Sequence, residues 1–188
     1  MPAGELALLF ADYPQACAQE LWKNASESFT GYFLSSSLFM CGGIQYRGNK
    51  IYFPQPGTKL PIKLRHGDVV WVLWGKRRNE GPGKFPNGGW ARLDSIKAGK
   101  WKPWHPRPVL IPADSFMEKD NEKRSHWLAL ESGMMIQALL AERGGEKRVY
   151  VVTEETPLEY RWIHDRWPRL VRVAEIVPKS GNQESRAR

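Results

Sequence analysis

The sequence VVWVLW at residues 69–74 is an uninterrupted apolar run with the length of a β-strand. A short apolar run bounded by turn residues is typical of a strand that is buried on both faces. Residues 66–68 (His-Gly-Asp) predict a turn before the run, and Gly75 ends it. We therefore expect residues 69–74 to form a central, fully buried strand.

Weaker strand patterns lie on both sides of this run. Upstream, residues 42–46 and 51–53 flank a turn predicted at residues 47–50, which together indicate a hairpin. Helical patterns are short: one begins at Asp94 or Ser95, and another covers residues 157–162. The sequence predicts a single α+β domain with a largely antiparallel, barrel-like β core and short flanking helices. The further strands are expected at residues 60–64, 108–112, 126–130, 134–140, 149–153 and 170–177.

The charge and the tryptophan content favour a polyanionic partner. The chain has 28 Lys and Arg against 20 Asp and Glu, and nine Trp among 188 residues. Trp interleaved with basic residues is the composition that stacks on unpaired bases, although several of these rings must fill the core. Interleaving is densest at residues 97–107, and a basic loop of 14 residues, 76–89, is long enough to indicate a function.

The cysteine and histidine counts exclude several classes of protein. Two Cys and four His make no disulfide framework and no recognisable metal site. No segment is long and apolar enough to span a bilayer, and none has the features of a signal peptide. We expect a cytoplasmic monomer without metal, cofactor or membrane contact.

The stretch Met40-Cys41-Gly42-Gly43 resembles the beginning of a protein. Removing Met40 would leave Cys41 with a free α-amine and a thiol on adjacent carbons. An α-amine has a pKa of about 7.7–8.0, so it is a better nucleophile than a Lys amine at neutral pH. A free Cys at the start of a buried strand is the alternative interpretation of this stretch alone.

Residues 1–39 differ in character from the rest of the chain. Three interpretations remain open: an upstream extension from a wrongly chosen start codon, a removable pro-segment, or a small helical cap. The domain is expected to span residues 40–178. Residues 179–188 are polar and are expected to form a disordered tail.

Four stretches in order carry a resemblance to a known family. They are Met40-Cys41-Gly42, Trp90-Ala91-Arg92-Leu93-Asp94-Ser95, residues 109–118 (VLIPADSFME), and Val152-Thr153-Glu154 leading to residues 163–168 (IHDRWP). Together they resemble the SOS-response-associated peptidase (SRAP) family, the abasic-site processing proteins. The resemblance covers roughly residues 40–172.

The resemblance implies an SRAP-like fold and covalent capture of abasic sites in single-stranded DNA, with autoproteolytic exposure of the N-terminal Cys and a side reaction as an AP lyase. It assigns Cys41 as the nucleophile, Glu118 as the acid/base group beside it and His164 as a second proton-transfer group. Arg92 matches the residue that holds a DNA phosphate. The further DNA-binding candidates are Trp74, Trp90, Arg77 and Arg78.

The chain departs from the family pattern at two positions. Trp90 stands where the family has Asn, and Gly43 stands where it more often has Arg. Two rival functions stay open: a single-strand nucleic-acid-binding module without chemistry and, ranked last because no oxyanion loop is recognisable, a Cys-His hydrolase acting on other peptides.

Overall fold

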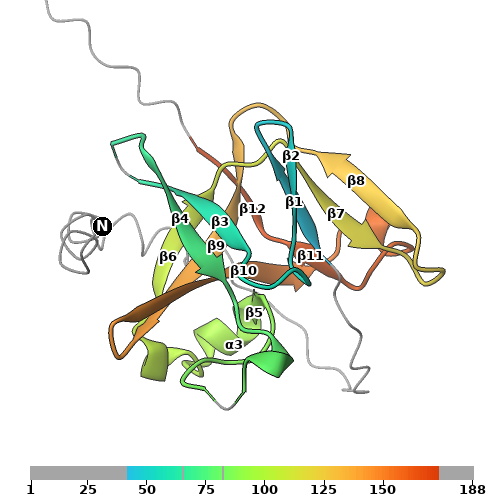
Figure 1. Cartoon of the computed structure of the whole chain (residues 1–188). Helices are drawn as coiled ribbons and strands as arrows, with labels where there is room; N and C mark the ends of the chain where they lie inside the picture. Colours follow the sequence, from blue (N-terminus) through green and yellow to red (C-terminus); the bar gives the residue numbers. More distant parts are fainter. Residues whose placement is uncertain (1–41, 65, 82, 174–188) are drawn as a thin grey trace, which may run out of the picture.

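β-strands dominate the computed structural model, which describes residues 42–64, 66–81 and 83–173 (Figure 1). The predicted nucleophile Cys41, the predicted extension at residues 1–39 and the predicted tail at 179–188 lie outside the described residues. Within the described part of the chain, no helix is long and apolar enough to cross a membrane.

Five strands close into a barrel that holds the main core. Four of its neighbouring pairs are antiparallel, and the parallel pairing of β4 with β10 closes it, with Val149 opposite Trp74. Short strands and a closed ring leave few unpaired edges. The predicted barrel-like, largely antiparallel core is thereby confirmed. The barrel strands are β3 (Lys59–Lys63), β4 (Val69–Trp74), β6 (Arg107–Ile111), β9 (Met134–Arg143) and β10 (Glu146–Glu155).

The strand β4 is buried on one face only. Val70, Val72 and Trp74 point into the barrel and pack in its core. Alternate side chains of a strand point to opposite faces, so Trp71 faces outward and is 50% exposed. The expectation of a fully buried strand at residues 69–74 was therefore wrong. An apolar run does not by itself distinguish a barrel wall from a central strand.

A second, four-stranded antiparallel sheet lies beside the barrel, in the order β2-β1-β7-β8. Its hairpin turn occupies only Arg47 and Gly48, which both have positive φ (49° and 77°), as a two-residue turn requires. The predicted four-residue turn was too long, because residues 49 and 50 already pair in β2. The strands are β1 (Gly43–Tyr46), β2 (Asn49–Tyr52), β7 (Ser115–Lys119) and β8 (Ser125–Ala129).

Short elements complete the two sheets, and helices are few. The one α-helix of the described residues is α3 (Leu93–Lys97), so the protein is mostly β rather than evenly α+β. The helix predicted at residues 157–162 is only the 3-10 turn η3 (Leu158–Tyr160). The remaining strands are β5 (Trp90–Arg92), β11 (Arg166–Pro168) and β12 (Leu170–Arg172), and the other 3-10 turns are η1 (Arg78–Glu80) and η2 (Lys102–Trp104).

Candidate functional site

Glu118 lies on a strand, directly across from the start of β1. The antiparallel register pairs Gly43 with Met117 and Ile44 with Phe116. One further step along this register brings Gly42, the residue bonded to Cys41, opposite Glu118. Opposed residues of an antiparallel pair share one face of the sheet. Glu118 lies within β7, near its end, and its side chain points inward.

The carboxyl group of Glu118 is buried without sufficient hydrogen bonding. The residue is 2% exposed, and its Oε2 atom has no hydrogen-bond partner. Burial disfavours the carboxylate and, with a smaller contribution from the negative charge of Asp165, raises the pKa of Glu118 to about 8. The carboxyl is thus mostly protonated at pH 7. A group with a pKa near the working pH can both donate and accept a proton.

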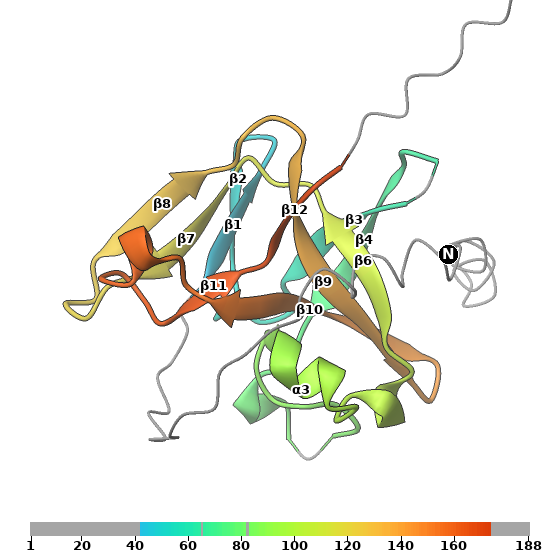
Figure 2. The same cartoon turned by 180° about the vertical axis from the view of Figure 1, so that it is seen from behind.

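The segment that carries His164 packs against the same face of the second sheet. The ring of Trp167 meets the ring of Phe116 edge-on, with centroids 4.9 Å apart. Phe116 lies two residues before Glu118, on the same face of β7. The predicted pair is thus brought to one end of the molecule, where the ends of β7 and β11 lie close together in both views (Figures 1 and 2).

Two contacts compete for one nitrogen of His164. The backbone N–H of Arg166 donates to its Nδ1 at 3.0 Å, which leaves Nε2 to carry the proton of a neutral ring. The Oδ1 atom of Asp165 lies 3.1 Å from the same Nδ1, a contact that requires a protonated nitrogen. These contacts fix the Nδ1 edge of His164 between the backbone of Arg166 and the carboxylate of Asp165.

Arg92 lies close to these residues because β10 joins its strand to β11. Thr153 of β10 is opposite Arg92 on one side and opposite Pro168 on the other. The guanidinium of Arg92 makes two hydrogen bonds to Asp94, at 3.0 Å and 2.5 Å. A DNA phosphate would have to compete with this carboxylate. The charge around Arg92 is therefore mixed rather than uniformly positive.

Trp90 packs against the backbone that precedes β1. Its ring lies 4.6 Å from the ring of Phe53 and 5.7 Å from that of Trp74. A Cβ atom on Gly42 would lie 2.7 Å from Cζ2 of Trp90, so only glycine fits at residue 42. Trp74 is 1% exposed, and its Nε1 donates to Gly89. The prediction that Trp74 contacts DNA was wrong, because the ring fills the core.

Arg77 also has a structural role rather than the predicted phosphate contact. It is 8% exposed, and its guanidinium donates to the backbone carbonyls of Phe53 and Trp74. It also lies over the ring of Phe53, 4.3 Å from the centroid. Burial lowers the pKa of Arg77, but the group stays charged. Arg78 is exposed, and its predicted DNA contact stays a prediction.

A second histidine, which the sequence motifs did not predict, lies beside Glu118. His126 of β8 is opposite Glu118 in the register, its Nε2 lies 2.9 Å from Oδ2 of Asp120, and its ring meets Trp162 edge-on at 5.1 Å. This hydrogen bond and Arg124 hold the pKa of Asp120 below its usual range. No local motif marks His126, since only strand pairing brings it to the site.

The arrangement places a buried, protonated carboxyl group opposite residue 42 and brings Arg92 to the strand next to β10. Among residues 42–64, 66–81 and 83–173, no group of three or more His, Cys, Asp or Glu side chains is placed to hold a metal ion. No protein-family model matches the chain, and no match to a curated protein is found.

Proposed function

We propose that this protein captures abasic sites in single-stranded DNA through a covalent bond to an N-terminal Cys41, as SRAP proteins do. The observation that carries the proposal is the position of Glu118. A buried carboxyl group, with an unpartnered oxygen and a pKa raised to about 8, lies opposite the residue bonded to Cys41. An unpaired buried acid is costly to stability, and such groups concentrate at functional sites.

The proposed reaction uses both nucleophiles of Cys41. The α-amine attacks the C1′ aldehyde of the open sugar and gives an imine with loss of one water. The thiol then adds to the same carbon, its proton passes to the nitrogen, and a five-membered thiazolidine ring forms. The ionised fraction of Glu118 accepts the proton that the amine loses, and His164 donates a proton to the ring oxygen of the deoxyribose, so that the sugar opens to the aldehyde before the amine attacks.

The extension requires a preceding step if it is translated. The thiol of Cys41 attacks the carbonyl carbon of Met40 and forms a thioester with loss of the amide bond. The proton of the thiol passes to the leaving nitrogen, and in this proposal the protonated carboxyl of Glu118, which lies opposite Gly42, relays it. Water then hydrolyses the ester. Cys41 and Glu118 would thus act both in the release of the extension and in the capture of the abasic site.

An oligonucleotide with one abasic site tests this proposal. We expect a chain that begins at Cys41 to form an adduct that survives a denaturing gel. Cys41→Ser should form none, and Glu118→Gln should form it at least about tenfold more slowly, as expected when one acid/base group is lost. The matched control is Glu131→Gln, an exposed carboxylate paired with Arg172. Equal rates for Glu118→Gln and the control would contradict the role of Glu118.

One observation favours the second candidate function, a binding module without chemistry. Trp90 stands where SRAP proteins have Asn, and its apolar ring packs against the place that a Cβ of residue 42 would occupy. No side-chain amide is then offered to the sugar from this position. Salt-sensitive binding of the same oligonucleotide by the Cys41-initiated chain, without any adduct, would support this second function.

A further inference from the structure

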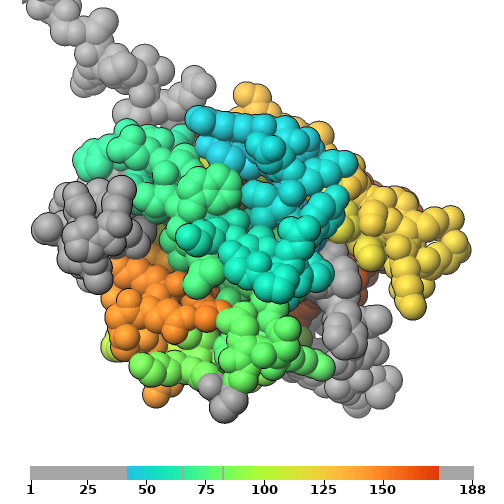
Figure 3. All heavy atoms as spheres, viewed as in Figure 1, coloured from blue at the N-terminus to red at the C-terminus, as the bar shows by residue number. Residues whose placement is uncertain are grey.

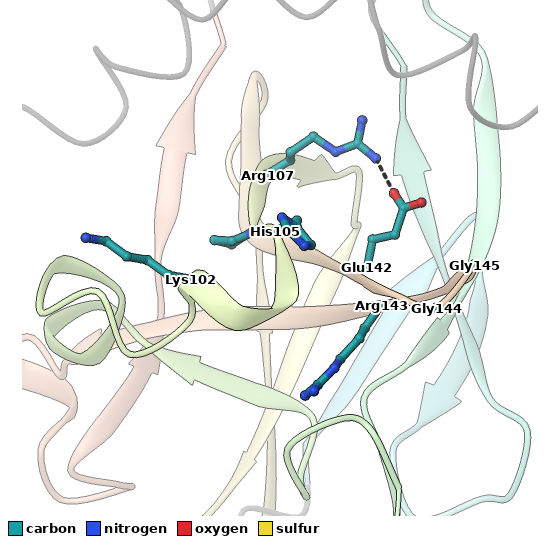
Figure 4. A pocket seen from close by; sticks show the side chains of 8 residues that line it. Lys102, His105, Arg107, Glu142, Arg143, Gly144 and Gly145 are labelled. Carbon is teal, nitrogen blue, oxygen red and sulfur yellow. Dashed lines mark hydrogen bonds and ion pairs between the residues drawn. The ribbon is translucent and has the colours of Figure 1, made fainter.

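The densest basic and aromatic stretch of the sequence, residues 97–107, lies away from the candidate site. It forms the end of α3, the turn η2 and the start of β6. Beside η2 lies a hollow of about 710 Å³, whose other wall is the turn between β9 and β10. The hollow is shown in Figure 4. It is lined by Lys102, His105, Pro106, Arg107, Glu142, Arg143, Gly144 and Gly145.

The tryptophans of this stretch hold the turn in place rather than line the hollow. Trp101 is 7% exposed, its ring meets Tyr150 edge-on at 4.9 Å, and its Nε1 donates to Ser95. Trp104 donates to the carbonyl of Lys84. A ligand of this hollow would therefore meet charged side chains instead of a stacking surface.

The charge around the hollow is strongly positive. Lys102 and Arg143 are exposed and make no ion pair within the described residues, and Lys84 places its ammonium 2.5 Å from where a Cβ of Gly144 would lie. Glu142 is the one acidic residue of the lining. Figure 4 shows its carboxylate joined to Arg107 at 2.9 Å, so this acid is neutralised within the wall.

The backbone of the hollow is also unusual. His105 has φ 44° and ψ 58°, a left-handed conformation that is uncommon for residues other than glycine. Such a conformation costs free energy and persists where the surroundings impose it, often at binding sites. Here it turns the chain from η2 into β6 and holds the imidazole of His105 at the hollow between Lys102 and Glu142 (Figure 4).

We propose that this hollow is a second phosphate-binding site, for the backbone of the DNA that occupies the candidate site. The ligand class follows from the surroundings of the hollow. They hold several cations and one acid that is already paired with Arg107, and they offer no aromatic ring on which a base could stack. The strand β10 links the two places: its first residue, Glu146, adjoins the hollow and its last, Glu155, pairs with β11. Ten residues of strand span about 30 Å.

This spacing sets the length of DNA that reaches both sites. A strand stacked as in B-DNA advances about 3.4 Å per nucleotide, so about nine stacked nucleotides flanking an abasic site are needed to cover 30 Å. The proposal rests on the proposed function only in taking single-stranded DNA as the ligand. Single-stranded substrates with four and with twelve flanking nucleotides separate one-site from two-site binding.

The test compares the double variant Lys102→Ala/Arg143→Ala with wild type by fluorescence anisotropy at several salt concentrations. We expect about tenfold weaker binding of the long substrate, and a decrease of about 1.4 in the slope of log affinity against log salt, because each phosphate contact on a single strand contributes about 0.7. The short substrate should bind as it does to wild type. The matched control, Lys59→Ala/Arg172→Ala, removes one exposed Lys and one exposed Arg elsewhere.

The outcomes separate this proposal from the proposed function. Unchanged binding of the long substrate by the double variant, or an equal loss for both lengths or for the control, would overturn the second site. Adduct formation by the same variants tests the chemistry of Cys41 and not the second site. If wild type forms no adduct while the double variant loses affinity for the long substrate only, the second site is supported and the proposed function fails.

Discussion

Replacing Glu118 by Gln should make the protein more stable at alkaline pH and change its pH dependence. The folded-state pKa of Glu118 is about 8, against an ordinary 4.5 that applies to the unfolded chain. Between these values the folded protein binds a proton that the unfolded chain has released. Stability from this group is therefore full below pH 4.5 and is lost as the pH rises through 8.

The expected magnitude follows from this difference in pKa. From pH 5 to pH 8 the linkage relation gives a loss of about 3.5 kcal/mol in the free energy of unfolding of the wild type, as an order of magnitude. The amide of Glu118→Gln does not ionise, so this loss should vanish. The variant should be on the order of 3 kcal/mol more stable than wild type at pH 8 and within about 1 kcal/mol of it at pH 5.

Urea denaturation at pH 5, 6, 7 and 8 measures these free energies directly, with Glu131→Gln as the exposed control. Wild type and the control should lose stability in parallel over this range, and Glu118→Gln should lose less. If the free energies of unfolding of the three proteins fall in parallel with pH, then Glu118 ionises with an ordinary pKa. Glu118 would then have no raised pKa to support a catalytic role.

Three further substitutions probe the neighbourhood of the site. Arg77→Ala should lower the free energy of unfolding by about 2–3 kcal/mol in urea denaturation, because it leaves buried backbone carbonyls without their donor. A loss of DNA affinity in the folded variant would contradict a structural role for Arg77. Gly42→Ala should cost about 1–3 kcal/mol through the clash with Trp90, and adding Trp90→Asn should reduce the cost; independent effects would refute that contact. Arg92→Ala should lower the salt slope of single-stranded DNA binding by about 0.7, whereas the exposed control Arg172→Ala should not; equal slopes would remove Arg92 from the DNA contact.

Periodic patterns predicted the strands well because they depend on local alternation. The hairpin of β1 and β2 and the strands β9 and β10 lie where expected, although β9 and β10 are longer than the apolar runs that mark them. Barrel closure depends on the parallel pairing of residues 73 and 74 with residues 148 and 149. Nothing in either local sequence signals that contact.

Exposure was harder to predict than secondary structure. Trp74 and Arg77 have the residue types of a DNA-binding loop, yet they pack around Phe53 in the protein interior. Trp71, expected in the core, faces solvent. The face of a strand is set by its partners across the barrel, and residue type alone does not contain that information.

Part of the candidate site could be predicted from the sequence, and part of it could not. The motifs around Glu118 and His164 were found in the sequence, and the fold brings their strands to one end of the molecule. The burial that raises the pKa of Glu118 comes from packing between strands, and the approach of His126 comes from the pairing of the neighbouring strands β7 and β8. These effects arise only once β7, β8 and β11 have assembled.

The most direct test is the intact mass of the protein after incubation with an oligonucleotide that carries one abasic site. We expect the Cys41-initiated chain to gain the mass of the oligonucleotide minus one water, the balance of a thiazolidine, while the same chain with its α-amine blocked by dimethylation gains nothing. An unchanged mass for the Cys41-initiated chain, or an equal adduct on the chain whose α-amine is blocked, would contradict the account.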